Sequence, residues 1–302
     1  MKLLSRSRFP RFRKQDGTPV DRYWSGHTVR SDRFRSAQES LDYLEHRFDL
    51  YPLFREFMGL WGDHSGETVL DYGCGPGNDL VGFAVYAKPQ HVIGVDVSHK
   101  ALRLAANRLE LHGVEPDRVE LLQVSDSSTT LPVADGRVDY VHCAGVLHHT
   151  SEPVAIMREF RRVLADGGRG CVMVYNRDSV WLHLYTAYIR MIAQGDFAGL
   201  TIEEAFTRNT DGPECPIARC YRPDEFSSLA GEAGFTATYR GGYLSRDELG
   251  WLAEHRDAAL ESPALAEEHK QFLRELEADA EGLPMFRGFH AGIGGVYELV
   301  PA

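Results

Sequence analysis

Long apolar runs and paired cysteines are both missing from this sequence of 302 residues. No run approaches the roughly 20 apolar residues that a membrane-spanning helix needs, and residues 1–4 are too short an apolar stretch for a signal peptide. The cysteines are odd in number and contain no Cys-x-x-Cys pair; they are Cys74, Cys143, Cys171, Cys215 and Cys220. These absences predict a cytoplasmic protein with reduced thiols and no membrane insertion.

Positive charge is also scarce, because 33 Lys and Arg stand against 44 Asp and Glu, a net charge of −11. Residues 1–35 hold ten basic side chains and three acidic ones, so the rest of the chain has a net charge of −18. An acidic body is a poor partner for nucleic acid or anionic membranes, and we expect neither. The basic arm, residues 1–35, fits a solvated tail or a lid on that body better than a contact with an anionic partner.

The sequence does contain a strand followed by a glycine-rich turn. An apolar run leads into Gly73, Gly75 and Gly77, which is typical of a buried strand that ends in a tight turn. Glycine suits such a turn because it adopts positive φ and lets a ligand approach the backbone closely. A helix over residues 78–87 would point its N-terminal amides at that ligand. Asp96 ends the next apolar run, where a carboxylate can accept both hydroxyls of a ribose, so the pattern predicts a nucleoside cofactor.

The spacing Asp-x-Gly-x-Gly-x-Gly, which begins at Asp71, resembles motif I of the class I S-adenosylmethionine (SAM) dependent methyltransferases. Dinucleotide-binding turns usually read Gly-x-Gly-x-x-Gly, whereas here the third glycine comes early. The resemblance implies SAM as cofactor and S-adenosylhomocysteine as product. It also implies these cofactor-binding residues: Asp71, Gly73, Cys74, Gly75, Gly77, Asp96, Val97, Asp126, Ser127 and Ala144. The alternatives are an NAD(P)-dependent oxidoreductase and a non-catalytic SAM-binding scaffold.

Later segments resemble the same family. Residues 125–127 take the place at which the family meets the adenine amino group, although Ser-Asp-Ser replaces the usual Gly-Asp-Ala. A strand over 138–144 and the segment 159–168 also match, and the nearest look is that of the quinone-biosynthesis branch. The family implies an α/β fold with a doubly wound, seven-stranded, mostly parallel sheet.

The expected domain organisation has three parts. After the basic arm come helices over 36–62 that cap the site, with one helix expected over 51–61. The SAM-binding domain follows over 63–302, with helical insertions at about 177–222 and 243–290 and a last strand over 292–300 that is antiparallel.

Histidines follow the fourth expected strand, at the edge of the sheet where such folds bind ligands. His148 and His149 are the candidate catalytic residues, because histidine is the natural base near neutral pH when the methyl acceptor carries a proton. The alternative for each is a structural hydrogen bond. We expect no metal, because neighbouring histidines point in different directions and no third ligand stands at a familiar spacing.

The loops after the fifth strand and in the first insertion are expected to present the acceptor. The candidate substrate-binding residues are Tyr175, Asn176, Arg177, Arg219 and Tyr221, with Arg219 either pairing an acidic acceptor or ordering its loop against Asp211. Tyr43, Glu45 and Arg47 are weaker candidates that fit a solvated helix face better. An aromatic-rich cap favours a small-molecule acceptor with apolar or ring surface, methylated on O, N or C, although core packing is the safer interpretation of each member taken alone: Trp181, Tyr185, Tyr188 and Phe206.

Overall fold

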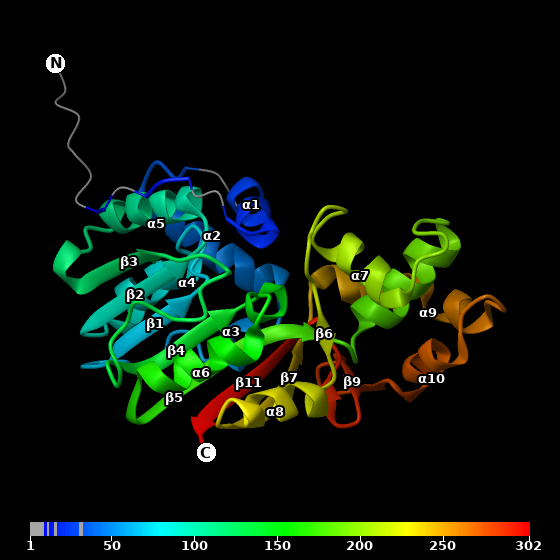
Figure 1. Cartoon of the computed structure of the whole chain (residues 1–302). Helices are drawn as coiled ribbons and strands as arrows, with labels where there is room; N and C mark the ends of the chain where they lie inside the picture. Colours follow the sequence, from blue (N-terminus) through cyan, green and yellow to red (C-terminus); the bar gives the residue numbers. More distant parts are fainter. Residues whose placement is uncertain (1–8, 11, 15–16, 30–32) are drawn as a thin grey trace.

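A seven-stranded mixed sheet forms the centre of the protein (Figure 1). The computed structural model describes residues 9–10, 12–14, 17–29 and 33–302. The strand order is β3-β2-β1-β4-β5-β11-β7, and a short strand, β6, pairs with β5. The strands are β1 (Thr68–Tyr72), β2 (His91–Asp96), β3 (Val119–Gln123), β4 (Val138–Ala144), β5 (Leu164–Asn176), β6 (Cys220–Tyr221), β7 (Phe235–Tyr243) and β11 (Gly294–Pro301). Neighbours from β3 to β5 are parallel, and β11 runs antiparallel to both β5 and β7, which confirms the expected sheet.

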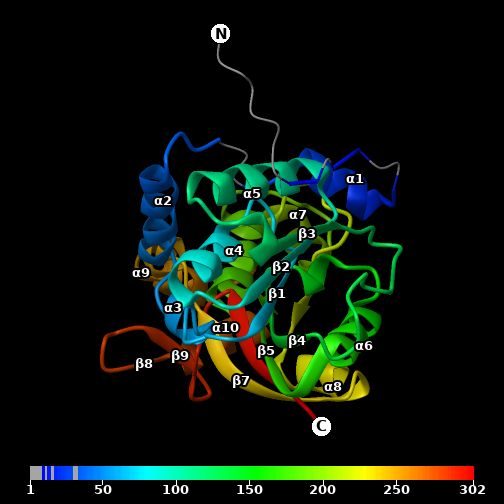
Figure 2. The same cartoon turned by 90° about the vertical axis from the view of Figure 1, so that its left-hand side faces the viewer.

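Helices cover both faces of this sheet (Figure 2). One face packs against α4 (Asn78–Gly82), the π-helix η1 (Phe83–Ala87) and α5 (His99–Leu111), and the other packs against α6 (Pro153–Val163) and α8 (Pro223–Glu232). The two cores follow from strand alternation, since successive side chains point to opposite faces. Val92 thus packs with Leu102 of α5, whereas the next residue, Ile93, packs with Phe160 of α6.

Part of the basic arm is helical. Residues 1–35 were expected to form a solvated tail or a lid, and within the described part of them α1 (Pro19–Gly26) forms a helix that begins with a capping box between Thr18 and Asp21. The predicted helix over 51–61 is wrong, because only α3 (Phe54–Phe57) is helical in that range and positive φ values at Leu53 and Gly59 bound it. Helix α2 (Ala37–Leu50) lies between α1 and α3, and the Ser36 side chain caps its N-terminus.

The insertions form a helical cap on one side of the sheet (Figure 1). It consists of the π-helix η4 (Trp181–Ala193), α7 (Ile202–Thr210), α9 (Arg246–Glu261) and α10 (Glu267–Glu275). A core of its own holds η4 against α9 and α10. The second insertion was expected to be helical, but it also contains a small antiparallel sheet of β8 (Glu277–Ala278), β9 (Pro284–Phe286) and β10 (Phe289–His290).

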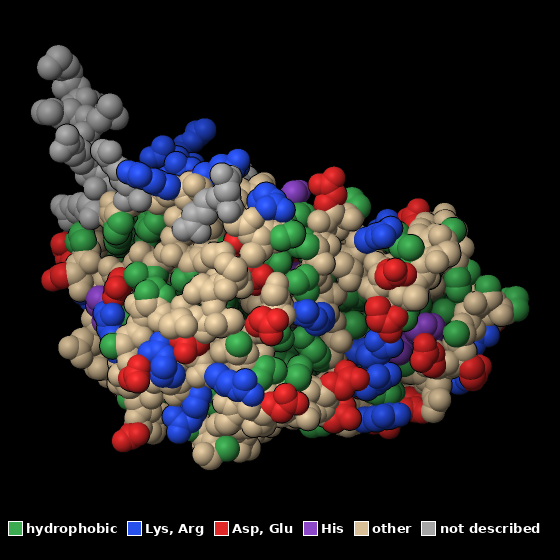
Figure 3. Space-filling model, in the orientation of Figure 1, with side chains coloured by type: hydrophobic (Ala, Val, Ile, Leu, Met, Phe, Trp, Pro, Cys, Tyr) green, Lys and Arg blue, Asp and Glu red, His purple; other side chains and the backbone are tan. Residues whose placement is uncertain are grey.

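Charged side chains of both signs are interspersed over the face shown in Figure 3. Two short 3-10 helices complete the fold, η2 (Pro116–Arg118) and η3 (Leu147–His149). Among the described residues, the helices are all too short or too polar to cross a membrane.

Candidate functional site

A cavity of about 440 Å³ lies at the carboxyl ends of β1, β2, β4 and β5, and its size is typical of a small-molecule site. The turn after β1, the start of α5 and the loop after β4 form one end of it. Helices α1 and α2 cover it from the N-terminal side, and the first insertion closes the other end through Trp181 and Asp211. The cavity therefore joins parts of the chain from residue 20 to residue 293.

The glycine turn after β1 is shaped by close packing. Gly73, Gly75 and Gly77 all have positive φ, at 75°, 54° and 84°. A Cβ on Gly73 would lie 2.2 Å from a methyl group of Val146, so only glycine fits there. Gly73 and Gly75 line the cavity together with Cys74, whereas Gly77 packs against Ala105 outside it.

Asp96 connects this turn to the second strand. Its Oδ2 accepts a hydrogen bond from the Gly75 amide at 2.9 Å, and its Oδ1 accepts one from the Ser98 amide at 2.7 Å. Burial raises the pKa of Asp96 to about 6 against these backbone bonds, which lower it. Ser98 itself caps α5, so the helix cap and the carboxylate are separate features. Asp96 and its neighbour Val97, both predicted to bind the cofactor, line the cavity.

Asp71 is the second acidic group at this end. Its Oδ2 is buried and has no hydrogen-bond partner among the described residues. Burial raises the pKa of Asp71 to about 7, and the nearby carboxylates of Asp79 and Asp96 act in the same direction. A buried carboxylate oxygen without a donor calls for a ligand that supplies one.

Arg47 reaches the same end from α2. Its Nη1 donates to Asp79 Oδ1 at 2.6 Å, while His142 Nε2 lies 3.0 Å from Asp79 Oδ2. Burial alone would raise the pKa of Asp79, but Arg47 and His142 hold it well below its usual range. Of the three weak candidates from this helix, Arg47 and Tyr43 line the cavity and Glu45 is exposed to solvent. The helical pattern of α2 could not show that Arg47 lies at the cavity, because its ionic partner, Asp79, is 32 residues away in the sequence.

The adenine position is only partly as expected. Asp126 lines the cavity, but its carboxylate already accepts hydrogen bonds from the amide and the hydroxyl of Ser151. The Asp126 amide in turn donates to Asp21 of α1 at 2.8 Å. Ser127 is exposed and does not line the cavity, so Asp126 is the better of the two candidates. Ala144, another predicted cofactor-binding residue, lies at the end of β4 and lines the cavity.

The two histidines after β4 have different surroundings. His149 lines the cavity, and its Nδ1 donates to the Ile217 carbonyl at 2.6 Å, which leaves Nε2 as the acceptor nitrogen. Burial lowers the pKa of His149. His148 is fully buried behind it, with its ring centroid 3.8 Å from that of Tyr175. In the described part of the chain neither ring nitrogen of His148 has a hydrogen-bond partner, and the cavity lining does not include it.

Only one of the five predicted substrate-binding residues reaches the cavity, namely Tyr175. Asn176 is buried and bonds the carbonyls of Asp178 and Gly292. The other three are Arg177, which pairs with Glu203, Arg219, which donates to the Thr150 carbonyl, and Tyr221, which packs in the main core. Arg219 therefore does not order its loop by bonding the carboxylate of Asp211.

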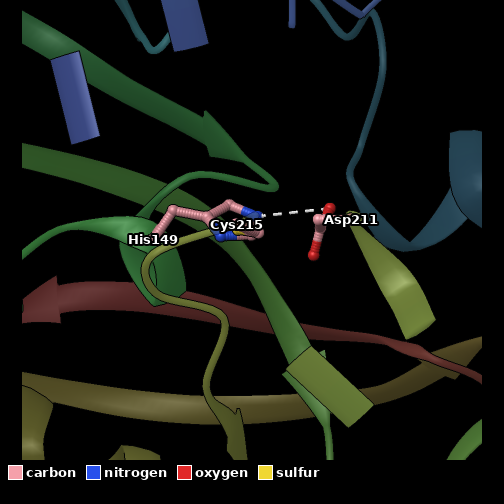
Figure 4. A group of neighbouring side chains, drawn as sticks. All are labelled: His149, Asp211 and Cys215. Atoms are coloured by element: carbon pink, nitrogen blue, oxygen red, sulfur yellow. Dashed lines mark ion pairs between the residues drawn. The ribbon is translucent and has the colours of Figure 1, made fainter. Parts of the chain in front are cut away.

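Asp211 instead pairs with groups at the cavity. Its Oδ1 accepts a hydrogen bond from the Tyr175 hydroxyl at 2.8 Å and lies 3.7 Å from His149 Nε2. Burial raises the pKa of Asp211, and the nearby His149 and the Tyr175 hydrogen bond lower it. Figure 4 shows that His149, Asp211 and Cys215 lie together, with potential ligand atoms all within 4.8 Å of one another. The sequence predicted no metal site, and its polar loop over 209–216 was the only signal for Asp211 and Cys215.

Helix α1 closes the cavity at these residues. The Tyr23 hydroxyl donates to the Asp211 carbonyl, and the Trp24 ring centroid lies 4.7 Å from that of His149. Both aromatics thus anchor α1 on the body of the protein. Residues 17–29 of that arm therefore pack on the body as a lid, and the remainder of the arm falls largely outside the described residues.

A family model described as a methyltransferase domain matches residues 63–215. A protein from transposon Tn4556 of Streptomyces fradiae, itself uncharacterised, is 36% identical over 146 residues, which cover 48% of this chain and 36% of that protein. The ubiquinone biosynthesis O-methyltransferase of Thiobacillus denitrificans is 26% identical over 62% of this chain and 72% of that enzyme. This chain spans between 36% and 42% of the length of the first three curated relatives.

Solved structures share the fold. The YcgJ protein of Bacillus subtilis matches with a TM-score of 0.53 and 18% sequence identity, over 82% of this chain and 98% of that chain. At that identity the match shows a common arrangement of the sheet and its helices, and it shows nothing of the chemistry.

Proposed function

The chain belongs to the methyltransferase domain family, and from this membership and the cavity we propose that it is a SAM-dependent methyltransferase acting on a small molecule. The observation that carries the proposal is a single cavity with an acidic end at the glycine turn and an aromatic end beneath α1 and the cap. The first end suits the cofactor, and the second suits an acceptor with ring or apolar surface. The methylated atom is an O, N or C atom of that acceptor.

The acidic end matches the charges of SAM. When bound, SAM supplies a methyl group that its positively charged sulfonium has already activated, and it carries an ammonium group as well. Asp71 offers a buried carboxylate oxygen that lacks a donor among the described residues, which an ammonium group would satisfy. Asp96 sits where a ribose would lie, and the amides of the glycine turn leave room for close approach. The residues present therefore fit the cofactor.

Arg47 suits the carboxylate of the same cofactor. Its guanidinium lines the cavity while Nη1 is held by Asp79 at 2.6 Å, so the fork is fixed in orientation before a ligand arrives. A guanidinium binds a carboxylate in two parallel hydrogen bonds, which adds geometric specificity to charge. Helices over 36–62 were expected to cap the site, and Arg47 of α2 gives the best support for that expectation.

The aromatic end supports an acceptor with ring surface. Its lining includes Trp24, Tyr175 and Trp181. Three more aromatic side chains of the cavity, Tyr51, Phe54 and Tyr243, pack together beside Arg47, whose guanidinium lies over the Phe54 ring. Of the aromatic residues that suggested such an acceptor, only Trp181 contributes, because Tyr185 stacks on Trp251 and Phe206 packs in a core with Leu182. A rigid aromatic wall orients a flat molecule, and orientation in line with the methyl–sulfur bond is most of what this reaction needs.

His149 is the residue best placed to accept a proton from the acceptor as a general base. It presents Nε2 to the cavity, and its ring is held by the Ile217 carbonyl on one side and by Trp24 on the other. His148 lies behind it and has no path to the cavity in this geometry, so we propose it as a packing residue of the wall behind Tyr175. All five cysteines are free thiols, which agrees with the proposed cytoplasmic location.

Calorimetry and an isotope assay test the proposal. SAM and S-adenosylhomocysteine should each bind the purified chain at one site, and NAD should not bind. Methyl-labelled SAM added to a fractionated small-molecule extract should pass its label to a ring-containing compound. Binding of NAD without any response to SAM would favour an oxidoreductase, and SAM binding without transfer to any fraction would favour a non-catalytic scaffold.

A further inference from the structure

We propose that His149, Asp211 and Cys215 bind a divalent zinc ion at the acceptor end of the cavity. The three side chains come from the loop after β4 and from the loop that follows α7, and their potential ligand atoms all lie within 4.8 Å of one another (Figure 4). This site is distinct from the acidic cofactor end, and its role in the reaction rests on the function proposed above. Metal binding itself does not depend on that function.

His149 is oriented as a metal ligand is. Its Nδ1 donates to the Ile217 carbonyl at 2.6 Å, so the ring is fixed and the lone pair is on Nε2. That nitrogen lies 3.7 Å from Asp211 Oδ1 (dashed line in Figure 4). Metal-binding histidines usually donate their other N–H to a carbonyl or carboxylate in this way, which fixes the tautomer and the direction of the lone pair.

Asp211 has a free coordination position. Its Oδ1 accepts from Tyr175, but within the described ranges its Oδ2 is buried and has no hydrogen-bond partner. A buried carboxylate oxygen without a donor is costly unless a ligand satisfies it. The main chain at this residue is also fixed, because its carbonyl accepts from the Tyr23 hydroxyl. The carboxylate is thus held at the cluster by contacts from two other segments.

Cys215 supplies the third ligand of the cluster. Its side chain is buried, and Sγ lies 3.3 Å from the Ile217 carbonyl, the same residue whose carbonyl orients His149. Cysteine binds metals as a thiolate, so the thiolate of Cys215 and the carboxylate of Asp211 together balance the two positive charges of the ion. Charge balance matters here because an uncompensated ion would be expensive in a buried site.

The donor set favours zinc over magnesium or calcium. Nitrogen, sulfur and oxygen ligands suit Zn²⁺, whereas Mg²⁺ and Ca²⁺ prefer oxygen alone. Tetrahedral zinc with bonds of about 2.0–2.3 Å keeps its ligand atoms roughly 3.3–3.8 Å apart. The ligand atoms of His149, Asp211 and Cys215 lie within 4.8 Å of one another, so the longest of these distances has to shorten by about 1 Å when the ion binds. Three protein ligands leave the fourth position open to the cavity, which His149 and Asp211 both line.

An open position at this place has a clear use. A hydroxyl of the acceptor that coordinates the ion loses its proton to solvent more readily, because the metal stabilises the resulting oxyanion. In that state His149 acts as a ligand, and the ion does the work otherwise expected of His149 as a base. The aromatic wall then holds the ring of the acceptor while the ion holds its oxygen.

The experiment is a metal titration of the full chain after treatment with a chelator and its removal. Zn²⁺ added in competition with a chromogenic chelator should bind at one ion per chain, and Co²⁺ should give the charge-transfer absorption of a thiolate ligand. Cys215→Ser should abolish that absorption and weaken Zn²⁺ binding by on the order of a hundredfold. Loss of a residue that only supports a ligand weakens metal binding by about 10–100-fold, and loss of a ligand itself should cost at least as much as the upper value. Cys220→Ser is the matched control, because that thiol lies on β6 outside the cluster and should leave both readouts unchanged.

Asp211→Asn provides a second variant if Cys215→Ser does not fold, and it should weaken Zn²⁺ binding as well. The proposal is overturned if the chain binds no Zn²⁺, or if it binds one ion that both variants retain at full strength. SAM binding by the metal-free chain is measured in parallel. Loss of the zinc response with intact SAM binding rejects only the metal site, whereas zinc binding without any SAM response rejects only the methyltransferase proposal.

Discussion

The two ends of the cavity are built in different ways. The glycine turn and Asp96 of the cofactor end come from residues 71–98, where two adjacent parallel strands bring them together through the bond from the Gly75 amide. The acceptor end joins Trp24, His149, Tyr175 and Asp211, which stand as much as 187 residues apart and meet only when α1 and the cap pack on the sheet. The centre of the first end follows from local geometry and Arg47 joins it from α2, whereas all of the second end depends on long-range packing.

The carboxylates of the two ends differ in how far they are satisfied. Both oxygens of Asp96 accept hydrogen bonds from backbone amides, so its position is fixed before any ligand binds. Asp71 at the cofactor end and Asp211 at the acceptor end each keep one oxygen that, among the residues described, no donor reaches. We therefore expect substitutions of Asp96 and Asp71 to act on cofactor affinity and substitutions of Asp211 to act on the acceptor or the metal.

The largest effect is expected at Asp96. Asp96→Ala removes the acceptor for two ribose hydroxyls, and charge-assisted hydrogen bonds are each worth about 1.5–3 kcal/mol. SAM affinity should fall on the order of a hundredfold, about 3 kcal/mol. Asp96→Asn should cost less, because one amide oxygen can still accept. Calorimetry on both variants measures the affinity.

Ser98→Ala is the control for this prediction. Its hydroxyl caps α5 by accepting from the Ala101 amide, so its loss should lower the stability by about 1 kcal/mol with little change in SAM affinity. Thermal unfolding and calorimetry on the same samples separate the two roles. Normal SAM binding by Asp96→Ala, with a lowered melting temperature, would reduce Asp96 to a structural residue of the turn.

Asp21 tests whether α1 belongs to the site. Its carboxylate accepts from the Thr18 amide, the Ser125 hydroxyl and the Asp126 amide, at 2.8, 2.6 and 2.8 Å. Asp21→Ala removes the capping box and the link to the cavity rim, so the stability should fall by about 2 kcal/mol. Asp257→Ala on the exposed surface of α9 is the comparison and should change little. An unchanged melting temperature for Asp21→Ala would show that α1 is not docked in solution.

The pH dependence of SAM binding sharpens the contrast at the cofactor end. Burial raises the pKa of Asp71 to about 7 in the ligand-free chain, and a cationic group beside it favours the ionised form. Affinity should therefore rise about tenfold between pH 6 and pH 8, with release of a proton on binding. Calorimetry in buffers of different ionisation enthalpy detects that proton, and Asp71→Asn should remove both the pH dependence and the release.

The same shift acts on stability in the opposite direction. Because the folded pKa of Asp71 is raised, its contribution to stability is present below the unfolded value near 4 and is lost as pH rises through about 7. The ligand-free chain should lose this contribution over that range, whereas bound SAM should offset the loss. A pH-independent affinity would place the ammonium group away from Asp71.

Much of the fold and the cofactor end could be predicted from sequence. The resemblance to class I methyltransferases is confirmed by the family match, and the antiparallel last strand lies where the sequence placed it. Asp71, Gly73, Cys74 and Asp96 all line the cavity. These residues could be predicted because each lies at or directly after the end of a strand, and parallel strands bring their carboxyl ends to the same edge of the sheet.

The acceptor end could not be read in the same way. Arg177 and Tyr221 were placed there because they follow strand and loop signals, yet an ion pair with Glu203 and packing in the main core hold them away. Asp211 reaches the cavity, with Cys215 close to it, because the loop after α7 folds back over β5, which no local pattern encodes. The second insertion likewise contains β8, β9 and β10, which are too short to show strand periodicity.

Tyr175 gives the smallest expected effect and the clearest separation of the two ends. Its hydroxyl donates to Asp211 at 2.8 Å, and its ring lines the cavity, so Tyr175→Phe removes one hydrogen bond and keeps the aromatic wall. Loss of one such bond is worth about 1 kcal/mol, so the Michaelis constant for the acceptor should rise about fivefold. The dissociation constant for SAM should stay the same, because no contact at the cofactor end changes.

Tyr185→Phe is the matched control, since that hydroxyl accepts from Arg190 within the cap and the ring stacks on Trp251 away from the cavity. It should leave both constants unchanged. If Tyr175→Phe instead weakens SAM and leaves the acceptor constant alone, Tyr175 belongs to the cofactor end and the boundary drawn between the two ends is wrong. If it changes neither, Asp211 holds its place without the hydroxyl, and the packing of the loop after α7 is sufficient to build the acceptor end.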